Sequence, residues 1–130
     1  MADTNLQRIL FVEDDPDIQT VARMALEAVG RFTVLACSHG AEALDKVAGF
    51  TPDLILLDVM MPGMDGPATL EALRRLPEAA DVPVVFMTAK VQAQEVARYR
   101  ELGAVDVIAK PFDPMALSET VRSIWSRLGS

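Results

Sequence analysis

Short apolar runs alternate along the chain with longer segments in which apolar and polar positions are mixed. Five runs have the length and hydrophobicity of buried strands: residues 9–12, 32–36, 54–57, 82–87 and 105–109. In the segments that follow them, apolar residues recur every three or four positions, which is the periodicity of a helix with one buried face. The pattern therefore predicts a succession of strand–helix units.

Polar residues and glycines mark where these helices are expected to begin and end. Asp15 and Asp113 each stand directly before a proline, and a capping side chain followed by proline favours the start of a helix. Ser38 is predicted to cap the second helix. Gly30 and Gly103 follow the first and fourth helical stripes, where a helix commonly ends on glycine.

Alternation of strands and helices is typical of an α/β protein in which a parallel sheet carries helices on both faces. Right-handed crossovers leave few arrangements of such a sheet. We expect a flavodoxin-like, doubly wound fold with a five-stranded parallel sheet in the order 2-1-3-4-5, flanked by five helices; the strand order is taken from known doubly wound proteins. The length of 130 residues suits one domain, residues 1–130.

Charge and cysteine content narrow the functional classes. The formal net charge of −7, from 19 acidic and 12 basic residues, argues against a general nucleic-acid binder, which needs a basic face. Cys37 is the single cysteine, so we predict a buried thiol and a reducing, cytoplasmic setting. The first five residues are polar and predict no signal peptide, and no apolar run approaches the roughly 20 residues of a membrane span.

Polar side chains follow four of the predicted strands. Glu13 and Asp14 come after the first strand, Asp58 after the third, Thr88 after the fourth and Lys110 after the fifth. In an open parallel sheet, ligands bind beyond the carboxyl ends of the strands where the strand order reverses. These side chains are therefore expected to converge on one small cleft.

The chemistry of this set favours a divalent cation and a phosphoryl group. Three clustered carboxylates repel one another unless a cation intervenes, and Mg²⁺ prefers carboxylate and phosphate oxygens. Asp58 is then a plausible nucleophile, because carboxylates form aspartyl phosphates. Mg²⁺ and Lys110 would neutralise charge on the transferred group, and Thr88 would donate a hydrogen bond to a phosphoryl oxygen.

Four segments resemble the signature blocks of bacterial response-regulator receiver domains, and the chain most resembles the single-domain, chemotaxis-regulator type. The segments are Phe-Val-Glu-Asp-Asp (11–15), Leu-Leu-Asp-Val-Met-Met-Pro-Gly-Met-Asp-Gly (56–66), Met-Thr-Ala-Lys (87–90) and Ala-Lys-Pro-Phe (109–112). The resemblance implies that Asp58 accepts a phosphoryl group from a sensor histidine kinase or histidine phosphotransfer protein. It also implies direct Mg²⁺ ligation by Asp14, Asp58 and the backbone carbonyl of Met60, with Glu13 acting through water, and a cis Lys110–Pro111 peptide bond.

Such a domain is a signalling switch and not an enzyme in the usual sense, since it catalyses only its own phosphorylation and slow dephosphorylation. Its expected output surface is formed by the fourth helix, fifth strand and fifth helix, which would contact a downstream protein or a second copy in a homodimer. No direct contact with nucleic acid or membrane is expected. Because the last helix uses the residues after Lys110, the chain either acts by protein contact or is one receiver from a longer protein.

Two positions depart from the family pattern. Val107 stands where many members have an aromatic residue that moves inward on phosphorylation, so the usual aromatic read-out is missing or replaced. Lys90 stands two residues after Thr88, a position where members tune the loss of the phosphate. Our hypothesis is that Met60 and Lys90 position a hydrolytic water poorly and that the phosphorylated state is long-lived.

Simpler roles are expected for several other residues. Asp15 is interpreted as a helix cap and His39 as a solvated or capping residue. The methionines at positions 60, 61 and 64 are predicted to pack within their loop. Trp125 and Leu128 are predicted to belong to the core, with contact to a partner as the alternative.

Three rival functions fit the residues less well. A haloacid dehalogenase-type hydrolase would need a general acid two residues after its nucleophile, where Met60 stands. A receiver-like module that is never phosphorylated would lack part of the acidic, threonine and lysine set. A flavin carrier would need a hydroxyl-rich loop after the first strand, where acidic side chains would instead repel the flavin phosphate.

Overall fold

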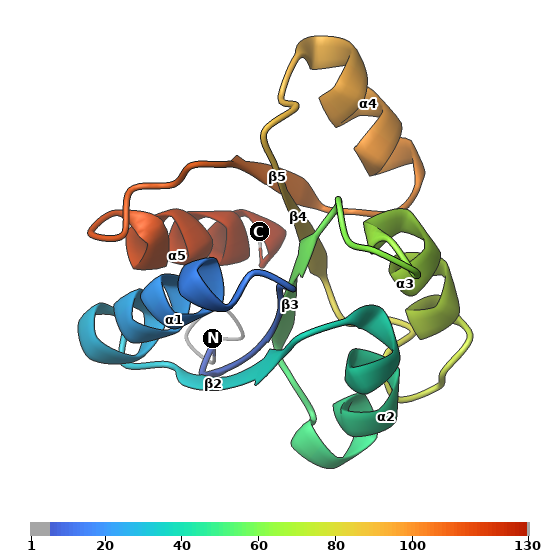
Figure 1. The fold of residues 1–130 in the computed structure, drawn as a ribbon, viewed down its shortest axis with the longest axis horizontal. Helices are drawn as coiled ribbons and strands as arrows, with labels where there is room; N and C mark the ends of the chain where they lie inside the picture. The colour runs from blue at the N-terminus through green and yellow to red at the C-terminus, as the bar shows by residue number, and fades with distance from the viewer. Residues whose placement is uncertain (1–5, 130) are drawn as a thin grey trace.

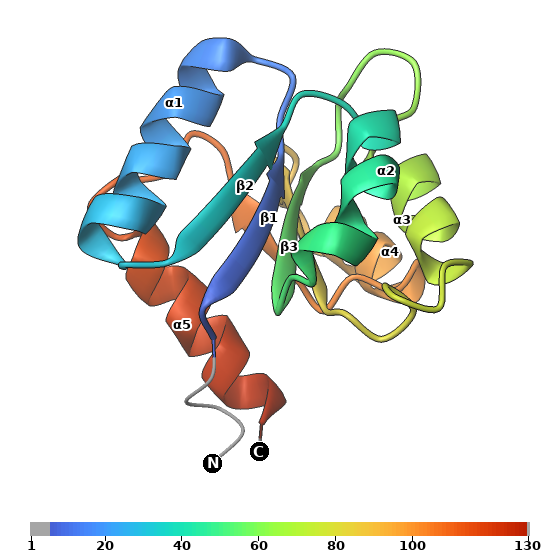
Figure 2. The ribbon, with the colours of Figure 1, turned by 90° about the horizontal axis from the view of Figure 1, so that it is seen from below.

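A computed structural model describes residues 6–129; residues 1–5, where no signal peptide is expected, and residue 130 lie outside the described part. Within it, the chain forms five strands: β1 (Arg8–Val12), β2 (Thr33–Cys37), β3 (Leu54–Asp58), β4 (Val84–Thr88) and β5 (Asp106–Ala109). All neighbouring strands are parallel, and their order is β2-β1-β3-β4-β5. Figure 2 shows β2, β1 and β3 side by side in this order. The predicted sheet topology is confirmed.

Helices connect the strands and cover both faces of the sheet. Their bounds are α1 (Pro16–Met24), the π-helical turn η2 (Ala25–Val29), α2 (Gly40–Phe50), α3 (Gly66–Arg74), α4 (Ala93–Glu101) and α5 (Leu117–Leu128). Helices α1 and α5 lie on one face, and α2, α3 and α4 lie on the other (Figure 1). This is the doubly wound arrangement that the alternating pattern predicts.

Alternation along the central strands divides the core into two layers. On β1, Ile9 and Phe11 belong to the cluster packed with α1 and α5, whereas Leu10 and Val12 belong to the cluster packed with α2 and α3. Successive strand side chains point to opposite faces, so a strand in the middle of the sheet is apolar at every position. All five residues of β3 are buried, including the acidic Asp58 at its end.

The observed helix starts confirm one predicted cap and correct another. Asp15 caps α1, because its Oδ1 accepts the amide N–H groups of Asp17 at 2.8 Å and Ile18 at 3.2 Å. The cap of α2 is His39 and not Ser38: the His39 Nδ1 accepts the Glu42 amide at 3.2 Å. The amide of Ser38 instead donates to the Glu42 carboxylate at 2.7 Å, which places Ser38 outside the helix.

The start and end of α5 also differ from the prediction. Asp113 closes a turn ahead of the helix, since its Oδ1 accepts the Met115 amide at 2.9 Å and its carbonyl accepts the Ala116 amide at 3.0 Å. The helix therefore begins at Leu117, three residues after the expected proline. At the other end Leu128 is 42% exposed, so its assignment to the core was wrong, while Trp125 packs half-buried against the α1–α5 layer.

A π-helical turn replaces the predicted last α-helical turn before Gly30. Ser118 of α5 donates to the Ala25 carbonyl at 3.1 Å, and the Arg122 guanidinium donates to the Gly30 carbonyl. Arg122 also lies over the Phe32 ring, 4.4 Å from its centroid. Side chains of α5 thus occupy carbonyls at the end of the first helical segment, and the wider turn η2 is compatible with these contacts.

Candidate functional site

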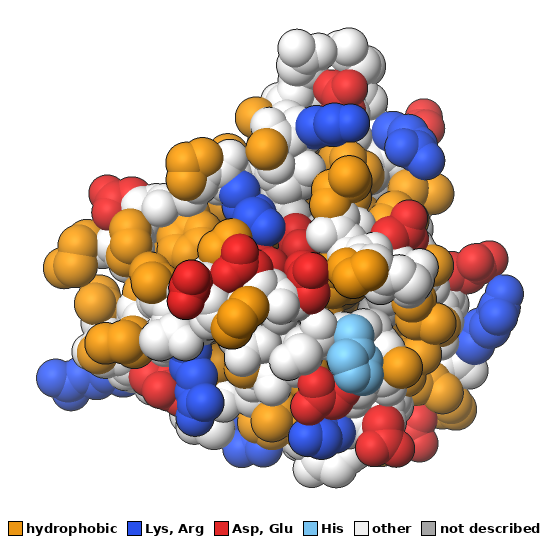
Figure 3. All heavy atoms as spheres, in the orientation of Figure 1, with side chains coloured by type: hydrophobic (Ala, Val, Ile, Leu, Met, Phe, Trp, Pro, Cys, Tyr) orange, Lys and Arg blue, Asp and Glu red, His pale blue; other side chains and the backbone are white. Residues whose placement is uncertain are grey.

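The predicted site residues meet at the carboxyl edge of the sheet. Asp58 is the last residue of β3 and Thr88 the last of β4, while Glu13 and Lys110 directly follow β1 and β5. Strands β1 and β3 are neighbours in parallel register, so acids from two separate blocks of sequence come together. Figure 3 shows acidic side chains grouped near the middle of this face, with a basic side chain beside them.

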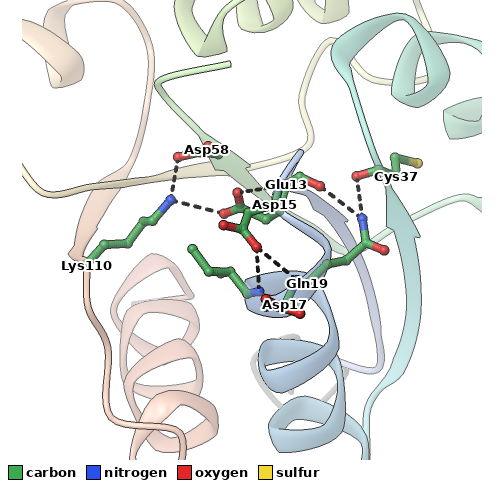
Figure 4. Close-up of polar contacts among 8 residues, drawn as sticks. Glu13, Asp15, Asp17, Gln19, Cys37, Asp58 and Lys110 are labelled. Carbon is green, nitrogen blue, oxygen red and sulfur yellow. Dashed lines mark hydrogen bonds and ion pairs between the residues drawn. The ribbon is translucent and has the colours of Figure 1, made fainter. Parts of the chain in front are cut away.

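Lys110 joins the two buried acids. Its Nζ lies 2.9 Å from Asp58 Oδ1 and 3.1 Å from Glu13 Oε1. Glu13 is 1% exposed and Asp58 2% exposed, and both carboxylates accept a hydrogen bond from the ammonium group of Lys110 (Figure 4). A buried charge is costly unless it is paired, so these contacts compensate for removing two carboxylates from water.

Backbone and amide groups fix Glu13 in place. Its Oε2 accepts the Asp15 amide at 3.1 Å, and its own amide donates to the Cys37 carbonyl at 3.0 Å. The Gln19 side-chain amide donates to both the Glu13 carbonyl, at 2.9 Å, and the Cys37 carbonyl, at 3.2 Å (Figure 4). Gln19 was missed from sequence; the available signal was a polar residue on the inward stripe that also holds Ala22.

Burial and mutual repulsion set the electrostatics of the cluster. Burial raises the pKa of Asp58 and of Glu13, and the charge of Lys110 partly opposes this rise. For Lys110, burial alone would lower the pKa, but its hydrogen bonds to Asp58 and Glu13 outweigh burial and the net pKa is raised. The site therefore gains from any additional positive charge placed between its carboxylates.

Carboxylate oxygens of Glu13, Asp14 and Asp58 lie within 4.8 Å of one another. Asp14 is exposed, so this group of acids reaches solvent on one side and is buried on the other. Several closely spaced carboxylate oxygens with an open side form the donor set that suits Mg²⁺, which keeps water molecules in its shell. The residues present thus fit a divalent cation.

Thr88 and the methionines complete the surroundings of the cluster. Thr88 is buried, and its Oγ1 accepts the Lys90 amide at 3.1 Å. Met61 is buried as predicted, but Met60 is 67% exposed and does not pack within the loop. In the sequence, Met60 comes two residues after Asp58.

Two expectations from the family resemblance concern the fifth strand: a cis peptide bond after Lys110, and the surroundings of Val107. The Lys110–Pro111 peptide bond is cis, as the resemblance implied. Val107 is half-buried and packs against the layer of α2, α3 and α4. Tyr99 of α4 is buried in the same layer, with its ring edge-on to Phe86 at a centroid distance of 5.2 Å.

A parallel sheet of this order, with acids, a threonine and a lysine at its carboxyl edge, is the arrangement that the resemblance to receiver domains implied. The model of the response regulator receiver domain family matches residues 9–122. The chain belongs to this family, whose members act in two-component signalling.

The curated relatives include regulators of transcription. The chain is 40% identical over 121 residues to the DNA-binding response regulator MtrA of Mycolicibacterium smegmatis, covering 93% of this chain and 51% of that protein. It is 38% identical over 121 residues to the transcriptional regulatory protein CseB of Streptomyces coelicolor, covering 93% of this chain and 50% of that protein. The chain thus spans about half the length of these curated relatives.

Among solved structures, the chemotaxis protein CheY4 of Vibrio cholerae superimposes with a TM-score of 0.84 at 27% identity, covering 92% of this chain and 98% of that one. Within residues 6–129, no helix is both long and apolar enough to cross a membrane.

Proposed function

We propose that Asp58 is the phosphoryl acceptor of this receiver domain, with a phosphohistidine of a sensor histidine kinase or histidine phosphotransfer protein as the donor. The observation that carries the proposal is the buried Asp58 carboxylate held by Lys110 beside two further acids. We assign the whole chain, residues 1–130, to this one domain. We place the reaction in the cytoplasm, in keeping with the free, buried thiol of Cys37.

The residues divide the work of the transfer. An Asp58 oxygen forms the new bond to phosphorus as the bond to the donor imidazole breaks, and the donor ring, already protonated on its other nitrogen, leaves as neutral imidazole. Asp14, Asp58 and the backbone carbonyl of Met60 would hold Mg²⁺, with Glu13 acting through water. Bound there, the ion would neutralise charge on the phosphoryl oxygens. Lys110, whose Nζ lies 2.9 Å from Asp58, would stabilise the same oxygens.

Phosphorylation would then change the surface of the domain. The new group adds about −1.5 to −2 charge and strong acceptor oxygens, which would attract Lys110 and the hydroxyl of Thr88. Thr88 leads into α4, so a shift there alters the face made by α4, β5 and α5. We propose that this face contacts a downstream protein or a second copy of the chain. The change is a population shift driven by how differently the two states hold the phosphoryl group.

The test uses Mg²⁺ with acetyl phosphate as a small phosphodonor, read by intact mass. We expect one stable phosphate on the wild type, none on Asp58→Asn, and a normal level on Asp45→Asn, an exposed acid of α2 that serves as the matched control. Continuous release of inorganic phosphate with no stable phosphoprotein would instead indicate a hydrolase. Absence of phosphate on the wild type would indicate a binding module that is not phosphorylated.

The lifetime of the phosphate forms a second part of the proposal. Met60 is exposed two residues after Asp58, and Lys90 lies two residues after Thr88. Neither side chain carries an acidic or amide group that would orient a hydrolytic water. We propose slow dephosphorylation. The double change Met60→Asn with Lys90→Glu is expected to accelerate phosphate loss, measured by intact mass over time; an unchanged rate would contradict this.

A further inference from the structure

The start of α4 differs from that of the preceding helices. Asp15, His39 and Asp65 each place a side-chain acceptor on the first turn of α1, α2 and α3. The residue before α4 is Gln92, and its side chain makes no capping hydrogen bond. The N–H groups of a first helical turn have no partner within the helix, so this helix begins without the side-chain acceptor that the other three possess.

A suitable acceptor lies close by but is not used. Glu95 is the third residue of α4, and its Oε1 is buried without a hydrogen-bond partner. A glutamate in this place can accept the backbone N–H of the residue before the helix, which here is Gln92. A buried acceptor that lacks a donor costs free energy. A hydrogen-bond donor brought to Glu95 Oε1 would remove this cost.

The connection from β4 to α4 is held by one hydrogen bond and lies beside a surface pocket. Its anchor is the hydrogen bond from the Lys90 amide to Thr88 Oγ1, at 3.1 Å. A surface pocket of about 390 Å³ is bounded by residues of this connection and of the first helical turn: Ala89, Lys90, Val91, Gln92 and Glu95. Glu95 and the segment that would have to move therefore border the same surface pocket.

We propose that Glu95 is a positioning residue for the phosphorylated state. When the Thr88 hydroxyl turns toward a phosphoryl group on Asp58, the contact with Lys90 is disturbed and residues 89–92 shift. In the new position the Gln92 amide donates to the Glu95 carboxylate, and the capped first turn holds the connection there. This inference rests on the function proposed for Asp58 and Thr88.

The arrangement would give the chain a read-out that does not need an aromatic residue at position 107. Val107 is too small to swing between two positions as a large ring does, and it packs against the layer of α2, α3 and α4. A carboxylate with two alternative environments supplies the required pair of states on α4 itself. A ligand shifts such an equilibrium by the difference in its interactions with the two states.

Amide hydrogen exchange of Gln92, measured with and without Mg²⁺ and acetyl phosphate, tests the proposal. Intact mass on the same samples records the phosphate. On phosphorylation we expect roughly fivefold slower exchange at Gln92 in the wild type, which is the order of effect of one capping hydrogen bond. Glu95→Gln keeps an acceptor oxygen and should retain the change, whereas Glu95→Ala should lose it. Glu101→Ala, an exposed acid at the other end of α4, is the matched control.

A second measurement, the stability of the unphosphorylated domain, distinguishes a positioning role of Glu95 from a purely structural one. Because Glu95 Oε1 has no partner in the unphosphorylated structure, Glu95→Ala should leave the urea midpoint of the unphosphorylated domain unchanged or slightly higher. Equal slowing at Gln92 in wild type and Glu95→Ala, or a phosphorylated wild type with no slowing, would overturn the inference while leaving Asp58 as the acceptor. A wild type that takes no phosphate would overturn the proposed function and this inference together.

Discussion

Replacing Lys110 with methionine removes the ammonium group shared by the two buried acids while keeping a long side chain. In the wild type, Nζ lies 2.9 Å from Asp58 and 3.1 Å from Glu13. The Lys110→Met variant leaves both carboxylates without this cation. We expect it to fold less stably in the absence of Mg²⁺ and to recover when the ion is added.

The expected loss follows from the burial of the three groups. Removing one partner of a buried ion pair costs about 3–5 kcal/mol. The Lys110 side chain is 18% exposed, and Asp14 opens the cluster to water, so we set the expected loss at about 2–3 kcal/mol near neutral pH. Burial raises the pKa of Asp58 and Glu13, so their folded forms bind protons at higher pH than their unfolded forms. The penalty is therefore largest at neutral pH and shrinks as the pH falls and the carboxylates are protonated.

Urea unfolding at several pH values, with and without Mg²⁺, measures these effects. An ion present at 100 times its dissociation constant adds about 2.7 kcal/mol, enough to restore most of the loss. Lys46→Met is the matched control, because its pair with Glu42 is on the surface, where solvent screens the attraction. A Lys110→Met variant as stable as this control at neutral pH would refute the reasoning that Lys110 compensates the buried charges.

Three further predictions follow from single contacts. Asp65→Ala removes the acceptor of the Ala68 amide at the start of α3 and should lower the free energy of unfolding by about 1 kcal/mol in urea titration; an unchanged midpoint would contradict the capping role. Gly66→Ala would place a Cβ 2.7 Å from the Asp58 carbonyl, so we expect a loss of about 1–3 kcal/mol, and unaltered stability would show that the backbone can yield. Burial raises the pKa of the Cys37 thiol to about 11 from 9.0, so thiol labelling at pH 8 should be at least about 100-fold slower in folded than in urea-unfolded protein, and equal rates would show that the thiol is accessible.

The sheet could be predicted from sequence because its central strands leave little choice. Residues 9–12 of β1 and 54–57 of β3 are apolar on both faces, and such runs form the buried middle of a parallel sheet. Once the strand order is known, the polar residues after each strand must lie at one edge. The convergence of Glu13, Asp58 and Lys110 follows from this topology, although their sequence positions are far apart.

Details that depend on distant side chains could not be predicted in the same way. The π-helical turn η2 lies against contacts from Ser118 and Arg122, which are 93 and 92 residues away from the carbonyls that they reach. His39 replaces Ser38 as the cap because the helix begins at Gly40, and both residue types can accept a backbone N–H at such a position. Local pattern gives the identity of an element, whereas its exact ends depend on tertiary packing.

The hydrogen bond between Lys110 and Glu13 joins residues 97 positions apart. It links the end of β1, the first strand in the sequence, to the end of β5, the last. During synthesis, a chain that has not yet reached β5 contains the acids but not the ammonium group that pairs with them. A competent acceptor would therefore arise only once the last strand has docked, because long-range pairing is formed late and at the cost of closing a long loop.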